Sequence, residues 1–123
     1  MQVHVVVVHP GLPTVVDIVV AGVPLQAEWV GSPPNAGELV DVELDIVSML
    51  GWGDAIAMDG AEATLREGPQ LRGNVEMQDQ DVLTLRIANG LLLVEIDDGS
   101  IEVSPGKAIV VVAENLKVYP TGI

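Results

Sequence analysis

The sequence contains no cysteine and no phenylalanine, and it has few basic residues. The absence of cysteine excludes disulfide bonds and thiol chemistry. Its only aromatic residues are one tyrosine and two tryptophans, so it lacks the stacking platforms on which single-stranded nucleic-acid binders rely. Five lysines and arginines face eighteen aspartates and glutamates, which gives a formal charge of −13. Because such a chain repels phosphate backbones and anionic lipids, we expect neither nucleic-acid nor membrane binding.

Long hydrophobic runs are also missing. The apolar runs are far shorter than the roughly 20 residues that a membrane-spanning helix needs. The first residues, Met1-Gln2-Val3-His4-Val5, lack the positive region of a signal peptide, and Asp17 interrupts the apolar stretch that follows. We therefore expect a cytoplasmic location.

What the chain does contain is aliphatic side chains in strand-like patterns. Hydrophobic residues make up 49% of its 123 residues, which excludes a disordered chain and fits a single domain over residues 1–123. In residues 39–46, Leu-Val-Asp-Val-Glu-Leu-Asp-Ile, apolar and acidic side chains alternate with a period of two, which is typical of a half-buried strand. Turn residues separate several such runs. This pattern predicts an all-β fold, a small closed or partly open β-barrel of the OB-like kind.

Other segments are less regular. Residues 5–8, 91–94 and 108–113 are apolar at successive positions, which indicates strands covered on both sides or strands at a subunit interface. Asn89-Gly90 lies between two apolar runs and predicts a hairpin. Only residues 54–66 look weakly helical, and Gly60 interrupts them.

The chain also contains a candidate internal repeat. Residues 15–22 can be aligned with residues 82–89, and a two-residue adjustment then pairs Gly37 with Gly106 and Val42 with Val111. The halves, at about 1–60 and 61–123, would be two related β-rich units in tandem. Two unrelated amphipathic hairpins also align to some extent, so a coincidental match is the other interpretation.

Candidate ligand-binding residues are few. Asp41, Glu43 and Asp45 form an acidic stripe on one strand face, where neighbouring carboxylates could share a hard cation such as calcium. The alternative is a solvated outer face, which the alternation favours. His4 and His9, five residues apart, are expected on opposite sides of a strand and so do not chelate one metal. We expect no cofactor.

Tryptophan is conspicuous in a chain with so few aromatic residues. Trp29 lies within an apolar run and is expected to close one end of a barrel. Trp52 lies between Gly51 and Gly53, which indicates a turn. It is either a second such plug or an exposed contact for a ligand or partner.

No catalytic signature is recognisable. The chain has no nucleophile elbow, no phosphate-cradling glycine loop and no zinc-protease motif. With eighteen carboxylates, a pairing of two for acid–base work carries no information. An enzyme is therefore possible but not indicated.

The second half of the chain resembles a known family. Its motifs are Leu71-Arg72-Gly73-Asn74-Val75, a long hairpin over residues 82–96, Ser104-Pro105-Gly106-Lys107, and a closing Leu116-Lys117-Val118-Tyr119-Pro120. Residues 71–120 thereby resemble the transport-associated OB-fold domain, a family that includes small molybdate-binding domains. The resemblance implies a five-stranded barrel, often paired, that sometimes binds oxyanions, with Arg72 and Lys107 nearest to such a site. The polar opening of the molybdate-binding members is missing before Leu71.

Three functional hypotheses follow. The leading one is a non-catalytic binding or assembly domain that acts through protein–protein contacts, as a homo-oligomer or with another protein. The second is a small-oxyanion-binding module of the transport-associated type. The third is a hydrolase or isomerase that uses carboxylates.

Overall fold

In the computed structural model, which describes residues 1–121, the chain consists mainly of β-strands, and no α-helix forms within that range. This confirms the all-β class expected from the sequence. Valine-rich segments form many of the strands, because β-branched side chains pack well on a pleated surface. The elements are β1 (Gln2–His9), β2 (Thr14–Val20), β3 (Val23–Trp29), β4 (Leu39–Ile46), β5 (Ile56–Met58), a 3-10 turn η1 (Glu62–Thr64), β6 (Gln70–Asp79), β7 (Val82–Ile87), β8 (Gly90–Glu95), β9 (Ala108–Val112) and β10 (Leu116–Pro120).

Five strands close into a small barrel, which we call the first lobe. Antiparallel pairing joins β1 to β2 and β2 to β3, and β3 pairs in parallel with β10. β10 then pairs with β4, and β4 returns to β1. Alternate side chains point inward, so that Val5, Val16 and Val118 are fully buried. A closed five-stranded barrel of this kind is OB-like, as the sequence predicts.

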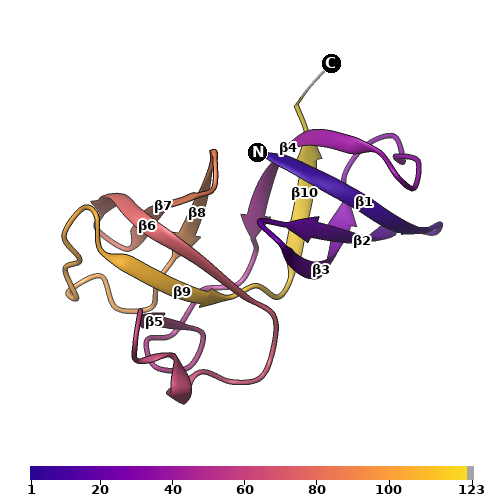
Figure 1. The fold of residues 1–123 in the computed structure, drawn as a ribbon. Helices are drawn as coiled ribbons and strands as arrows, with labels where there is room; N and C mark the ends of the chain where they lie inside the picture. Colours follow the sequence, from indigo (N-terminus) through magenta and orange to yellow (C-terminus); the bar gives the residue numbers. More distant parts are fainter. Residues whose placement is uncertain (122–123) are drawn as a thin grey trace.

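The other five strands, β5 to β9, form the second lobe (Figure 1). β6, β7 and β8 form an antiparallel meander, and β9 lies between β6 and β5. Leu50, which precedes β5, makes a parallel bridge with Ile96, just beyond β8. Residues 50–58 thus occupy the place in the second lobe that β10 takes in the first.

Each lobe therefore takes one strand from the other half of the chain. β5 follows β4 in sequence but belongs to the second lobe, and β10 follows β9 but belongs to the first (Figure 1). The two crossing connections are hydrogen-bonded to each other. Val47 N–H donates to Asn115 O at 3.1 Å, and Asn115 Nδ2 donates to Ser48 Oγ at 2.7 Å. A short parallel pairing of β4 with β8 also joins the lobes.

The two lobes make similar backbone contacts in equivalent places. The N–H of Gly37 donates to Val5 O, and the N–H of Gly106 donates to Val75 O, both at 2.7 Å. Gly37 and Gly106 have φ angles of +90° and +89°, a backbone conformation that favours glycine. A β-bulge follows Val5 in β1 and Val75 in β6. The halves of the chain thus share these features of backbone geometry, whatever their origin.

Of the three segments that are apolar at successive positions, one is covered by the chain itself. Ile109, Val110, Val111 and Val112 of β9 are fully buried. One face of β9 lines the barrel core, and the connection after β5 packs over the other. Gly68 in that connection approaches Val112 so closely that a Cβ would meet its Cγ1 at 2.8 Å.

The other two segments are not covered. In residues 5–8 the side chains of Val6 and Val7 are exposed, and in residues 91–94 those of Leu91 and Leu93 are exposed. Of the two interpretations that the sequence allows, burial by the chain itself does not apply at these positions. Both strands therefore present apolar surface that another molecule could cover.

Two local expectations are wrong. Residues 54–66 form β5 and the 3-10 turn instead of a helix, and Gly60, at φ +96°, lies outside the helical region. His4 and His9 are both exposed on the outer face, where they pair with Val19 and Val15 of β2. The bulge after Val5 inserts one residue, which reverses the alternation between the two histidines.

The predicted hairpin forms between β7 and β8. Ile87 pairs with Gly90, so the two-residue turn consists of Ala88 and Asn89, one residue earlier than Asn89-Gly90 indicated. Ala88 adopts a φ of +53° in this turn. No helix within residues 1–121 is long and apolar enough to cross a membrane.

Candidate functional site

The acidic stripe lies on the outer face of β4. Asp41, Glu43 and Asp45 are exposed, while Val42 and Leu44 between them are buried. Among residues 1–121, no group of three or more histidine, aspartate or glutamate side chains is arranged to hold a metal ion. The geometry therefore gives no support for a cation at the stripe and fits the other interpretation, a strand face turned to solvent.

Trp52 lies against the core more than on the surface. Its side chain is partly buried and packs on the hydrophobic core, and its backbone bridges to Ile56. The indole Nε1 is buried and has no hydrogen-bond partner among the described residues. Trp29, by contrast, is buried and donates its Nε1–H to Ser32 O at 2.8 Å. Trp52 therefore resembles a plug with an unmatched polar atom, and little of it is available to a partner.

Arg72 is on β6, and its charge is already matched. Its guanidinium is ion-paired with Asp59 and, at 2.9 Å, with Glu62. The hydrogen bond from Arg72 lowers the pKa of the Glu62 carboxyl, and the same contact raises the pKa of Arg72. The hollow of about 350 Å³ beside Arg72 does not include Lys107, which is exposed in the turn before β9. The structure does not bring the two predicted oxyanion ligands together.

The other arginines are paired in the same way. Arg86 is ion-paired with Glu76. Arg66 approaches Asp54 at 3.6 Å and Glu114 at 3.5 Å. An added anion would thus compete with a carboxylate at each of the three guanidinium groups.

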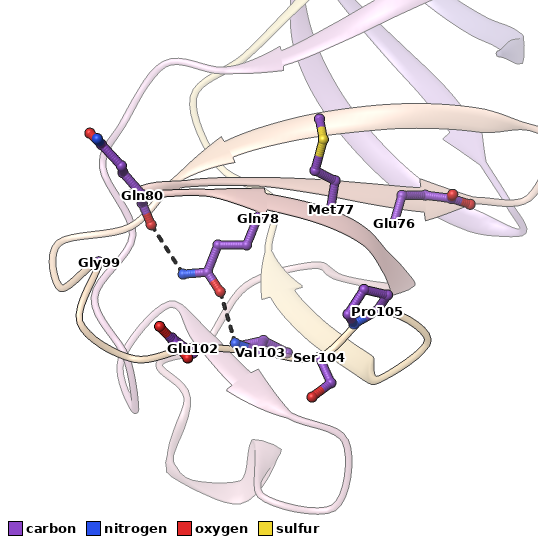
Figure 2. Close-up of a pocket in the computed structure, with 9 residues that line it drawn as sticks. All are labelled: Glu76, Met77, Gln78, Gln80, Gly99, Glu102, Val103, Ser104 and Pro105. Carbon is purple, nitrogen blue, oxygen red and sulfur yellow. Dashed lines mark hydrogen bonds between the residues drawn. The ribbon is translucent and has the colours of Figure 1, made fainter.

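An open groove lies at one end of the second lobe, and we call it the β6 groove (Figure 2). It has a volume of about 770 Å³ and lies between the end of β6 and the loop that leads to β9. Its lining consists of Glu76, Met77, Gln78, Gln80, Gly99, Glu102, Val103, Ser104 and Pro105.

The Gln78 side chain spans the β6 groove and holds its two walls together. Its Oε1 accepts the Val103 N–H at 2.8 Å, and its Nε2 donates to Gln80 O at 3.0 Å (Figure 2). The same Nε2 also donates to Ile101 O at 2.9 Å. Both N–H groups of the amide are therefore bonded to the protein, and its oxygen accepts one hydrogen bond from it. The lining carries one hydroxyl and two carboxylates, and it contains no histidine beside Ser104 that could act as its base.

A second candidate lies where the lobes meet. Leu93 on β8 is the neighbour of Asp45 on β4 in the short parallel pairing between the lobes. Leu91, Leu93 and Val47 are 46%, 54% and 56% exposed. On the far side of β4, Tyr119 of β10 lies opposite Glu43 and is also exposed. We call this sheet face, formed by the outer side chains of β8, β4 and β10 together with Val47, the joint surface.

The joint surface is hollowed on both sides of Leu93. One hollow of about 310 Å³ is lined by Leu93, Val47, Asp45 and Glu95, among others. The other, of about 500 Å³, is lined by Leu93, Leu91 and Glu43 together with Arg86. Apolar side chains thus project between one hollow bordered by two carboxylates and another bordered by Glu43 and by Arg86, which is itself ion-paired with Glu76. This arrangement suits recognition of a side chain that is apolar along its length and basic at its end.

Sequence reasoning did not single out Leu91 and Leu93. The signal was the continuous apolar run at residues 91–94, which allowed two interpretations. The alternation that places Leu92 and Val94 in the core sends Leu91 and Leu93 outward, and β4 reaches the edge of β8 without covering them. Comparison of the chain with protein-family models, with curated proteins and with solved structures gave no match.

Proposed function

We propose that this protein is a non-catalytic binding domain that acts through protein–protein contacts at the joint surface. The observation that carries the proposal is the exposure of Leu91 and Leu93 side by side on β8, between two hollows. Apolar side chains grouped on one face mark interaction sites, whereas single exposed ones are common on any protein. Burial of two leucines would contribute a few kcal/mol to binding, at roughly 1.5–3 kcal/mol for each fully buried side chain.

The charges around the leucines indicate the kind of partner. Glu43, Asp45 and Glu95 border Leu91 and Leu93, and none of the three forms an ion pair within residues 1–121. A segment with apolar side chains next to lysine or arginine would cover the leucines and pair with these carboxylates. The formal charge of −13 on the chain would also speed the approach of such a segment.

A selection of short random peptides displayed on phage, with the protein immobilised, tests the proposal. We expect the selected peptides to combine apolar residues with lysine or arginine. In titrations with a fluorescently labelled selected peptide, Leu93→Glu should weaken binding by about tenfold or more, which corresponds to 1.4 kcal/mol. The substitution removes an apolar contact next to Asp45, and its added carboxylate, which attracts a basic peptide, would not by itself weaken binding.

Met77→Glu is the matched control. Met77 is 58% exposed, close to the 54% of Leu93, but it lines the β6 groove and not the joint surface. This variant should bind the same peptide as tightly as the unmodified protein. Equal weakening by both substitutions would show that the loss of binding is not specific to the joint surface. Binding unchanged in Leu93→Glu would place the contact elsewhere, and either result would contradict the proposal.

The oxyanion-binding alternative has weaker support. Arg72 is held by Asp59 and Glu62, and Lys107 lies outside the hollow beside it. A thermal shift assay with molybdate, tungstate, sulfate and phosphate tests it directly. An anion that binds only the folded chain should raise its stability by about 2.7 kcal/mol at a hundredfold excess over the dissociation constant.

No arrangement of groups favours the enzymatic alternative. The β6 groove offers no nucleophile with a base, and the side-chain amide of Gln78 in this groove is hydrogen-bonded to the protein itself. The cytoplasmic location expected from the sequence is part of the present proposal, and the absence of cysteine fits it.

A further inference from the structure

β1 in the first lobe and β6, its counterpart in the second, are each paired on both edges over only part of their length. β1 pairs with β4 through residues 2–4, whereas its pairing with β2 continues to His9. Val5 then bonds to Glu38 and Gly37. Within residues 1–121, no further backbone hydrogen bond reaches this edge of β1. Residues 6–9 therefore form a free strand edge, and residues 76–79 of β6 stand in the equivalent place.

The two free edges are protected differently. The edge of β6 carries Glu76 and Asp79, and Gln78 ties the neighbouring loop alongside it (Figure 2). Charged residues and covering loops are the usual means by which proteins prevent an edge strand from pairing with another chain. Residues 6–9 of β1 are Val-Val-Val-His, with neither a carboxylate nor a lysine or arginine. Val6 and Val7 are 45% and 40% exposed.

We propose that the free edge of β1 pairs in antiparallel fashion with the same edge of a second copy of this chain. Two-fold symmetry makes an antiparallel strand edge self-complementary, and the unpaired N–H and C=O groups of residues 6–9 would bond to one another. The pairing would extend the sheet across both molecules and bring the exposed valines together. This goes beyond the proposed function, because it uses a different strand and a different partner.

The charge distribution favours a second copy over a charged partner at this edge. A strand with lysines or glutamates would lose water around its charges and find no opposite charge on residues 6–9. Glu38, whose backbone bonds to Val5 at this edge, accepts a hydrogen bond from Asn35 Nδ2 at 2.7 Å, and the other neighbouring carboxylate is Asp17, opposite Val7. It accepts hydrogen bonds from His9 Nε2 and from Gln26 Nε2, each at 3.1 Å. An identical valine edge meets this surface without such a loss.

The net negative charge of the chain opposes dimer formation, and the effect of salt on this repulsion provides a separate test. Two copies with a formal charge of −13 each repel one another at a distance. Salt weakens this repulsion, since the screening length falls from about 30 Å at 0.01 M to about 10 Å at 0.1 M. The dimer should therefore form more readily as salt is raised, whereas binding of a basic segment at the joint surface should become weaker.

Analytical ultracentrifugation over roughly 1 μM to 1 mM protein, a range that covers weak to moderate association, measures the dimer at two salt concentrations. Val7→Lys is compared with Met77→Lys, which introduces the same charge at the equivalent position of the protected edge. Val7→Lys should raise the dissociation constant by more than about tenfold, because the two-fold contact would bring a lysine from each copy close to the other, and like charges repel. Met77→Lys should leave it unchanged.

Hydrogen–deuterium exchange of the unmodified protein provides a measurement that does not depend on how a variant folds. The amides of residues 6–9 should exchange more slowly as the protein concentration rises, while those of residues 76–79 should not change. A protein that stays monomeric at 0.1 M salt throughout the range overturns the proposal. A dimer that Val7→Lys leaves intact, or that Met77→Lys disrupts to the same degree, also overturns the proposal. Protection of other amides in place of those of residues 6–9 overturns it as well.

Discussion

Replacement of Gln78 by alanine would test how the end of the second lobe is held. Its side chain joins the end of β6 to the loop that precedes β9 through three hydrogen bonds. Oε1 accepts from Val103 N–H, and Nε2 donates to Ile101 O and Gln80 O, at 2.8, 2.9 and 3.0 Å. Alanine removes all three. The loop before β9, which lies between the open groove and the core, would then lose the side chain that fixes it to β6.

The expected loss of stability depends on which of the three hydrogen bonds water can replace. A typical intramolecular hydrogen bond contributes about 0.5–1.5 kcal/mol net. The carbonyls of Ile101 and Gln80 are in an exposed setting, so water can take the place of the amide. The Val103 N–H is partly buried and would lose its partner. We therefore expect Gln78→Ala to lower the free energy of unfolding by about 2 kcal/mol and the melting temperature by roughly 5–10 °C.

Urea titration and differential scanning calorimetry measure both quantities, with Gln26→Ala as the control. Gln26 is also a strand glutamine, but it is exposed and makes one side-chain hydrogen bond, to Asp17 at 3.1 Å. Its replacement should cost less than about 0.5 kcal/mol, as is usual for surface positions. The argument fails if the two substitutions lower stability equally, since Gln78 would then be one more surface residue. Faster hydrogen exchange at Val103 in Gln78→Ala would locate the effect.

Two further predictions concern the tryptophans and the dependence of the unfolding free energy on pH in acid. Trp29→Phe should lower the unfolding free energy by about 1–2 kcal/mol more than Trp52→Phe, because only the Trp29 indole has a hydrogen-bond partner to lose; urea midpoints that rank the variants the other way would contradict this. The pKa values of Asp17, Glu62 and Asp98 are lowered in the folded chain, chiefly by hydrogen bonds from His9, Arg72 and Ser100. Stability from these groups is present above their unfolded values, near 4, and is lost as pH falls through the lower folded values. Urea midpoints should therefore decline below about pH 4, and a steady rise there would contradict the assignment.

The parts of the fold that depend on short-range pattern were predictable. The alternation in residues 39–46 predicts which side chains of β4 are buried, and Asp41, Glu43 and Asp45 are indeed on the outside. This succeeds because a half-buried strand has a period of two, whatever it pairs with. The turn between β7 and β8 also depends on the local sequence, and its predicted position was wrong by only one residue.

The parts that depend on distant pairing were not predictable. Residues 56–58 lie in the segment that looks weakly helical, and nothing local determines which lobe this segment or residues 116–120 join. The bulge in β1 reversed the expected placement of His4 and His9 for a similar reason, since it is set by pairing with β2. Arg72 could be named as a cation, but its ion pairs with Asp59 and Glu62 follow from how the connection after β5 folds over the sheet.

The strand exchange bears on the proposed function as well as on the fold. The leucines of the joint surface belong to β8 in the second lobe, whereas the carboxylates Glu43 and Asp45 belong to β4 in the first. They lie together because β4 pairs directly with β8, close to the place where the two crossing connections join the lobes. Any opening of the lobes would separate the apolar and acidic parts of the surface. A partner that binds both parts must therefore favour the closed arrangement, so its binding should stabilise the whole fold and not one lobe alone.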